Sequence, residues 1–140
     1  MATTIQNTDA WDITVYQGKT YVEEFTIQVL TNPNEEYNAL TNPYIVLNLT
    51  DYDVRMMVRS SFDSASVKLS ALSTGVSPRF VKDNLNGVIT LTLIPTDTSS
   101  IIFTGEQADY VYDIELASTT NNIVLLVCAG QFIIKREVTR

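Results

Sequence analysis

The sequence feature that most constrains the fold is an alternation of apolar and polar side chains with a period of two residues. In residues 52–59, Val54, Met56 and Val58 occupy every second position, and charged residues occupy most of the positions between them. Successive side chains of a strand point to opposite faces of a sheet, so this pattern predicts a strand with one face in a core and the other in water. The alternation recurs along the chain and predicts an inward-facing set made up of Trp11, Ile13, Val15, Phe25, Ile27, Val29, Val54, Met56, Val58, Ile89, Leu91, Leu93, Tyr110, Tyr112, Ile114 and Leu116.

The last strand is expected to lie inside its sheet. Residues 123–134 are apolar at consecutive positions, which is typical of a strand that is covered on both faces. Gly130 interrupts the run, and a glycine inside a strand pattern suggests a β-bulge. Cys128 belongs to the same run, so we expect a small buried hydrophobic side chain there; the alternative is a reactive thiol.

Turn-forming residues separate the strands, and one irregular stretch is long. Leu30–Leu47 exceeds the usual length of a loop without structure of its own. It is either an elaborated loop or contains a strand at Tyr44–Leu47, and we favour the strand. Pro95–Ile102 begins with proline and polar residues, which suits a single helical turn.

These patterns predict an all-β fold, namely an immunoglobulin-like β-sandwich of about seven strands with at most one short helical turn. No helical pattern of 10 to 15 residues separates the strands, which excludes an alternating α/β plan. We expect one sandwich domain at residues 11–134, an N-terminal arm at residues 1–10 and a C-terminal tail at residues 135–140.

The immunoglobulin plan makes two local predictions. It places the strands at 52–59 and 109–116 side by side, so that Arg55 and Arg59 face Asp113 and Glu115. Tyr110 follows a polar corner at the entry of a late strand, where a tyrosine corner would bond its hydroxyl to nearby backbone. The alternative for Tyr110 is an ordinary aromatic core residue.

Composition excludes several classes of chemistry. The chain contains no histidine, which removes histidine bases, Ser-His and Cys-His nucleophiles and nearly all catalytic zinc sites. The five glycines are too far apart to form a phosphate-binding loop. A net charge of −7 repels nucleic acid and anionic membranes, so we expect neither as a partner. No catalytic residue, cofactor site or metal site is predicted.

Three weaker alternatives remain. The carboxylate pairs Asp51 with Asp53 and Asp113 with Glu115 could serve as acid and base, although such pairs on a strand are usually a solvated face. An acidic loop offers hard oxygen ligands for calcium through Asn32, Asn34, Glu35 and Glu36. Exposed aromatic residues could form a sugar-binding platform or anchor a protein interface; the candidates are Tyr16, Tyr37 and Tyr44.

The order of the segments also resembles a known group of proteins. Trp-Asp-Ile-Thr-Val-Tyr-Gln-Gly-Lys-Thr at 11–20 leads into an alternating strand, and the segments 47–59, 87–93, 110–116 and 130–140 follow. This order resembles small immunoglobulin-like virion proteins of tailed bacteriophages, related to the N-terminal domain of baseplate upper proteins and to short tail-associated proteins. The resemblance spans most of the chain, and the length of Leu30–Leu47 departs from it.

The resemblance implies a non-enzymatic structural component of a phage virion, made in the host cytoplasm and located in the tail, baseplate or neck. It implies docking to other virion proteins in symmetric copies, as a homo-oligomer within the assembly, without nucleic acid or membrane. The alternative is a sugar- or receptor-binding β-sandwich module. Because the inward residues form the core, we expect recognition at the strand edges, the 30–47 segment or the two termini.

Overall fold

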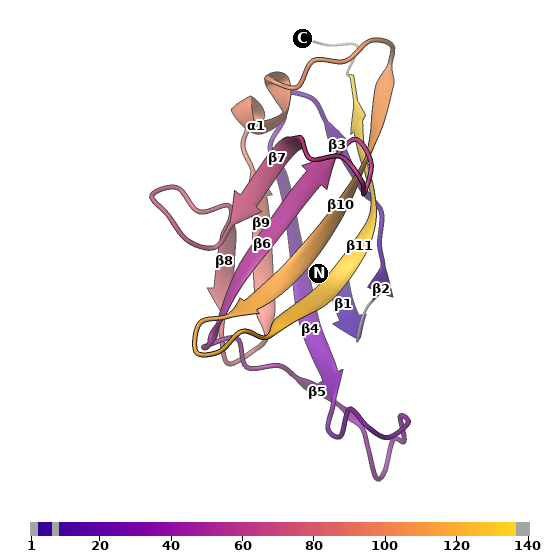
Figure 1. Cartoon of the computed structure of the whole chain (residues 1–140), viewed down its shortest axis with the longest axis vertical. Coiled ribbons are helices and arrows are strands. Elements are labelled where there is room, and N and C mark those ends of the chain that lie inside the picture. The colour runs from indigo at the N-terminus through magenta and orange to yellow at the C-terminus, as the bar shows by residue number, and fades with distance from the viewer. Residues whose placement is uncertain (1–2, 7–8, 137–140) are drawn as a thin grey trace.

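The computed structural model describes residues 3–6 and 9–136, and side chains from residue 10 onward. Two β-sheets pack face to face, and one short helix lies at the end of the molecule opposite the 30–47 segment (Figure 1). The predicted all-β sandwich is therefore confirmed. There are more strand segments than the seven expected, because several short strands extend the two sheets.

The first sheet is built around a long strand, β4, which alternates in burial as the sequence predicts. Its strands follow the order β1-β4-β9-β8, and β5 pairs with the end of β4. The bounds are β1 Thr3–Gln6, β4 Tyr21–Leu30, β5 Tyr44–Val46, β8 Phe80–Asp83 and β9 Val88–Leu93.

The second sheet contains the two longest strands, β10 and β11. Its order is β2-β11-β10-β6-β7, and β3 also pairs with β11. Together, the two orders reproduce the ABED and C′CFG strand arrangement of immunoglobulin-type sandwiches. The bounds are β2 Asp9–Ala10, β3 Ile13–Tyr16, β6 Tyr52–Arg59, β7 Val67–Leu72, β10 Gln107–Ser118 and β11 Val124–Lys135.

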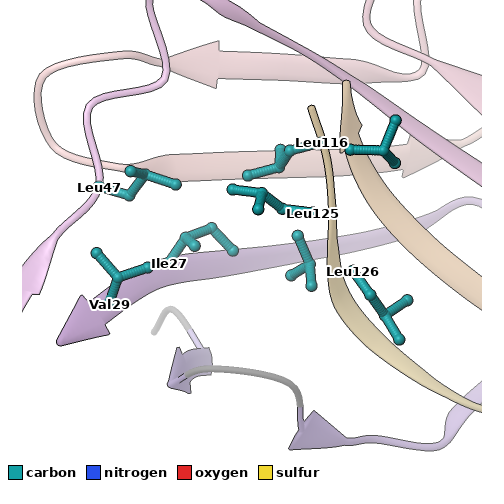
Figure 2. A pocket seen from close by; sticks show the side chains of 8 residues that line it. Ile27, Val29, Leu47, Leu116, Leu125 and Leu126 are labelled. Atoms are coloured by element: carbon teal, nitrogen blue, oxygen red, sulfur yellow. The ribbon is translucent and has the colours of Figure 1, made fainter. Parts of the chain in front are cut away.

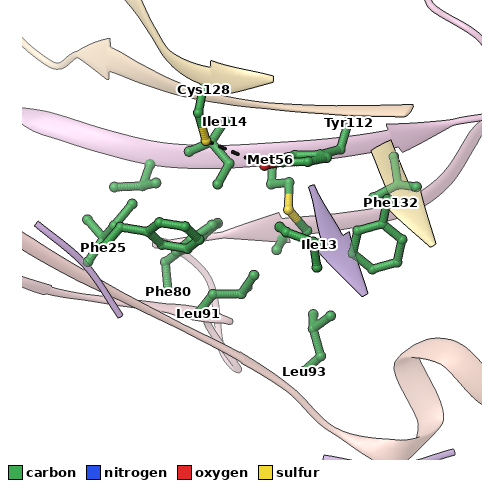
Figure 3. Packing of buried hydrophobic residues seen from close by; sticks show 14 of the residues in the cluster. Ile13, Phe25, Met56, Phe80, Leu91, Leu93, Tyr112, Ile114, Cys128 and Phe132 are labelled. Carbon is green, nitrogen blue, oxygen red and sulfur yellow. Dashed lines mark hydrogen bonds between the residues drawn. The ribbon is translucent and has the colours of Figure 1, made fainter. Parts of the chain in front are cut away.

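The core lies between the sheets and consists mainly of the predicted inward set (Figure 3). Phe25, Met56 and Ile114 are fully buried, as are most of their alternating neighbours. Two residues were predicted wrongly. Trp11 lies before β3 and is 38% exposed, and Val29 is only half-buried because β4 extends beyond the facing sheet there.

β11 is an internal strand, as predicted, but the bulge is not at Gly130. The register with β10 shifts after the pair Ile114–Cys128, so Val127 and Cys128 are buried in succession. Gly130 instead allows a close approach of backbone, because a Cβ there would collide with the Trp11 carbonyl oxygen. That carbonyl accepts a hydrogen bond from the Tyr112 hydroxyl.

The N-terminal segment contributes a strand to each sheet. β1 pairs parallel with β4, while β2 and β3 pair parallel with β11. Within the expected arm at residues 1–10, the described residues pair through their backbone with a strand of each sheet. Residues 1–2 and 7–8 lie outside the described residues.

The first two residues of the expected tail at 135–140 continue the hydrogen bonding of β11. Lys135 pairs with Gln107 at the end of β11, and the Arg136 amide donates to the Glu106 carbonyl at 2.9 Å. The Arg136 guanidinium lies over the Phe103 ring, 4.7 Å from its centroid. Residues 137–140 lie outside the described residues.

Both predictions for the irregular stretches are confirmed. The strand expected at Tyr44–Leu47 is β5, which pairs antiparallel with β4. The helical turn is α1 Pro95–Ser99, where the Asp97 carboxylate accepts the Ile94 amide at 2.9 Å and a bidentate pair of bonds from Arg79.

Candidate interaction site

The carboxylates of β10 take part in cross-strand pairing with β6. Glu115 lies opposite Arg55, and the two side chains form an ion pair at 3.0 Å. Asp113 instead lies opposite Met57, and Arg59 lies opposite Val111. The predicted neighbourhood of the strands is therefore confirmed, but only one of the two predicted facing ion pairs forms; the Arg59 guanidinium donates to the Ser64 carbonyl at 3.0 Å.

Asp113 has an unusual environment for a strand carboxylate. Burial raises its pKa, the neighbouring carboxylate of Glu115 raises it further, and Arg59 and Arg55 oppose both effects. The side chain nevertheless lies on the outer face of the second sheet, because the inward positions of β10 are Tyr112 and Ile114. A small pocket of about 50 Å³ lies beside the Asp113 side chain, lined by residues that include Met57, Arg59 and Phe62.

The acidic loop is organised by a buried amide. Asn42 is 1% exposed, and its side-chain nitrogen donates to the carbonyls of Asn32, Glu35 and Glu36 at 3.0, 3.1 and 2.9 Å. Its side-chain oxygen accepts the Asn32 amide at 2.7 Å. The carbonyl oxygens that converge inside this loop therefore bind an amide group. Across residues 3–6 and 9–136, no three acidic, histidine or cysteine side chains gather as a metal site would require.

The three candidate tyrosines do not form one platform, and Tyr44 is half-buried rather than exposed. Tyr37 stacks on Tyr44 with ring centroids 5.1 Å apart, within the 30–47 segment. Tyr16 lies at the end of β3 and pairs with Lys135 of β11, and both strands belong to the second sheet. Figure 1 shows β3 and the 30–47 segment at opposite ends of the molecule.

Cys128 is fully buried, which confirms the expected hydrophobic role. Its sulfur lies 3.6 Å from the Tyr112 hydroxyl (Figure 3). Burial is the main cause that raises the pKa of Tyr112, and the neighbouring thiol adds to it. Neither group is accessible to a substrate in solution.

The tyrosine whose hydroxyl bonds to backbone is Tyr112. Its acceptor, the Trp11 carbonyl, belongs to the N-terminal segment and not to the corner before β10. Tyr110, which was the predicted corner tyrosine, is buried, and burial raises its pKa.

An apolar groove opens between the sheets at one end of the sandwich (Figure 2). Its volume is about 300 Å³, and every residue that lines it is aliphatic. Most of its residues belong to β4 of the first sheet and β11 of the second. The lining residues are Ile27, Val29, Leu47, Leu116, Val124, Leu125, Leu126 and Val127.

Exposed apolar side chains continue from the groove onto the surface around it. Val124 and Leu126 belong to the groove itself and are exposed, and Ile123 precedes them. On the first sheet, Ile45 of β5 lies opposite the groove residue Val29 and is also exposed. Apolar surface of this kind on a folded chain is typical of an interaction site.

A structured loop, residues 31–43, projects from the same end of the molecule (Figure 1). At its tip, the Asn38 side chain accepts the amides of Leu40 and Thr41 at 2.9 and 3.1 Å, and Asn38 forms a bridge with Asn42. Leu40 is 93% exposed. The loop therefore holds a leucine in water on a backbone that its own hydrogen bonds stabilise.

Sequence reasoning expected an interface at the 30–47 segment but missed the groove and Leu40. The groove residues of β11 belong to an apolar run that predicts a central strand. In such a run, apolar residues that are buried cannot be told from apolar residues that are exposed. Leu40 lies in a turn-rich loop with no periodic partners. The neighbouring asparagines, which favour local side-chain to backbone bonds, were the only available signal of a structured tip.

Strand edges offer a second kind of surface. β1 and β8 terminate the first sheet, and β7 terminates the second. Val81 on β8 and Val67 on β7 are exposed. Such edges can accept a strand from a partner.

Neither a scan against protein-family models nor a search of the curated proteins finds a match for this chain. Within the described part of the chain, no helix combines the length and the apolar character needed to cross a membrane.

Proposed function

We propose that this chain is a non-enzymatic structural component of a tailed-phage virion, in the tail, baseplate or neck, where it docks to other virion proteins in symmetric copies. The observation that carries the proposal is the pairing of an apolar groove with a stabilised, leucine-tipped loop at one end of an immunoglobulin-type sandwich. Both features suit protein contact, and the order of segments resembles that of small phage virion proteins.

The chemistry of the described residues supports the same proposal. Tyr112 and Cys128 are buried in the core, and burial raises the pKa of Tyr112. A catalytic group has to reach a substrate, which these two core side chains do not. Asp113 is half-buried on the outer face of the second sheet, where Glu115, Arg55 and Arg59 are its charged neighbours. The buried side chains stabilise the sandwich, and its surface is left to bind neighbours.

The test is to purify phage particles from cells that make the chain and to measure its copy number by quantitative mass spectrometry. We expect the chain to stay with the particles through a density gradient, at a fixed ratio to the other tail or neck proteins. The control is a cytoplasmic host protein of similar abundance, which the gradient should remove. A chain that is lost with that control would overturn the proposal.

A sugar- or receptor-binding module is the second candidate, and one observation favours it. Tyr37 is 55% exposed and stacks on Tyr44, which presents an aromatic ring next to polar loop backbone. Aromatic rings of this kind can pack on sugars or on protein. Binding of the isolated chain to a glycan array, abolished by Tyr37→Ala and retained by Tyr16→Ala, would support this second function.

A further inference from the structure

The turn between β8 and β9 places an asparagine directly before a glycine. Residues 84–87 join the two strands, and the last two of them are Asn86 and Gly87. The backbone nitrogen that follows an asparagine can attack the side-chain amide carbon and close a succinimide ring, which is one reason why asparagine is a thermolabile residue. Because glycine has no Cβ, it leaves this nitrogen unshielded. The turn therefore contains both reactants of an intramolecular deamidation.

The structure leaves both reactants accessible to each other. The Asn86 side chain is exposed, and its amide nitrogen donates to the Asp83 carboxylate at 2.9 Å. The Gly87 amide reaches the Asn84 carbonyl at 3.4 Å, which is longer than a normal backbone hydrogen bond. The attacking nitrogen therefore gives up only a weak bond, and no packing of the Asn86 side chain in the core has to be broken.

Asn86 also has the sequence context that favours this reaction. Of the five glycines in the chain, only Gly87 follows an asparagine. Asn32 and Asn42 precede proline, whose ring nitrogen has no proton to lose, so the same ring cannot close there. These two asparagines serve as internal references for the reaction at the turn.

We infer that Asn86 deamidates spontaneously in the folded chain, through attack of the Gly87 nitrogen on its side-chain amide carbon. A bond forms between these two atoms, the bond from that carbon to the amide nitrogen breaks, and the amide leaves as ammonia with the proton that the Gly87 nitrogen gives up. Water then opens the ring at either of its carbonyl carbons. The products carry aspartate at position 86, or isoaspartate with the backbone running through the side chain.

The surroundings of the turn make this reaction a structural change. The Gly87 carbonyl accepts the Ile27 amide at 2.8 Å, and a Cβ on Gly87 would collide with the Val46 side chain. Isoaspartate inserts an extra backbone atom directly before this closely packed glycine. Either product also places a second carboxylate beside Asp83, where an amide now donates a hydrogen bond. Both products should therefore be less stable than the chain with Asn86.

Peptide mapping of the aged protein tests the inference. The purified full chain is incubated in its folded state in a mildly alkaline buffer, where the attacking nitrogen loses its proton more readily, and is then digested beside an unincubated sample. We expect the peptide with residues 86–87 to exchange its amide for an acid progressively and to give two isomers. The peptides with Asn32 and Asn42 should stay unchanged.

Two results of this mapping would overturn the inference. The first is an 86–87 peptide that changes no faster than the peptides with Asn32 and Asn42. The second is a change that occurs when the chain is incubated in urea but not when it is folded, because the turn would then protect Asn86 and not expose it.

Asn86→Gln is the matched variant, since it keeps the amide group but its longer side chain disfavours ring closure. We expect this variant to lose the ammonia release that comes from the turn. Asn34→Gln makes the same change at another exposed loop position and should leave the release unaltered. An equal release from both variants would contradict the assignment to Asn86.

Thermal unfolding measures the structural effect. Asn86→Asp reproduces the product with the ordinary backbone and should melt at a lower temperature than the native chain. The aged fraction, separated by anion exchange, should melt lower still because it also contains isoaspartate. An aged fraction that melts together with the fresh chain would overturn the inferred effect on the turn. The outcome does not depend on the proposed function, since every measurement uses the isolated chain.

Discussion

At the scale of single residues, the buried polar groups account for the local structure that periodicity does not predict. Asn42 is the clearest case, because one buried amide bonds three carbonyls and one amide of its own loop. Removal of this side chain would leave several buried polar groups without a hydrogen-bond partner. Leaving such groups unpaired costs more free energy than the hydrogen bonds themselves contribute.

Asn42→Ala is therefore expected to lower the free energy of unfolding by about 2 kcal/mol, because several backbone groups of the loop lose their partner. Urea titration measures this change, and hydrogen exchange at the Asn32 amide should accelerate. Asn34→Ala is the control in the same loop, since that side chain is exposed, and should change stability by less than about 0.5 kcal/mol. Equal effects of the two variants would contradict this account of the loop.

Asp113 leads to a prediction about pH. Its pKa is raised in the folded chain, chiefly by burial, so the folded state binds its proton more tightly than the unfolded state does. The stabilisation from the protonated form is present at low pH and is lost as the pH rises through the folded pKa. Asp113→Asn should therefore raise the melting temperature at pH 7.

The comparison of pH values separates this effect from packing. At pH 3 the carboxyl group is largely protonated, so Asp113→Asn should change the melting temperature much less there than at pH 7. Scanning calorimetry at both pH values measures the difference. A gain of the same size at both values would show that charge is not its cause.

At the scale of elements, alternation predicts strands well and their partners poorly. The pattern at 52–59 and 109–116 predicts both strands, because each has one clearly apolar face, and their pairing was predicted from the immunoglobulin plan. β1 has the sequence Thr-Thr-Ile-Gln, which carries no such face, and its parallel pairing with β4 follows from tertiary context. The β11 bulge is hidden for the opposite reason, since apolar residues on both faces look the same in either register.

The close packing of β11 against the N-terminal segment predicts a strong effect of a small substitution. In Gly130→Ala the added methyl group would collide with the Trp11 carbonyl and approach the Asp12 carboxylate at 2.9 Å. We expect a loss of about 1 to 3 kcal/mol in the free energy of unfolding. Ser70→Ala, a small change at an exposed position of β7, is the control and should change the free energy of unfolding by less than about 0.5 kcal/mol. Tolerance of Gly130→Ala would mean that the N-terminal segment packs more loosely than described.

At the scale of the whole molecule, shape and charge make different contributions. The two-sheet sandwich follows from the hydrophobic pattern, whereas the net charge of −7 has no part in the fold and opposes association of like chains. The function proposed for the chain rests on a surface, and surfaces leave the weakest periodic signal in a sequence. For this reason the sequence predicts an interface at the 30–47 segment but does not predict the apolar groove beside it.

The charge leads to a prediction about salt. Copies that meet in the proposed assembly each carry a net charge of −7, so raising the salt concentration screens their repulsion and should strengthen self-association. Sedimentation velocity at about 0.05 and 0.5 M sodium chloride measures the trend, where the Debye length falls several-fold. A weakening with salt would instead indicate that ion pairs hold the copies together.

The most direct measurement of the central claim is a density map of intact phage particles from cells that make this chain. We predict that the sandwich fits density in several symmetry-related copies in the tail, baseplate or neck, with the 31–43 loop against a neighbouring protein. Particles in which every such copy is accounted for by other proteins would contradict the claim.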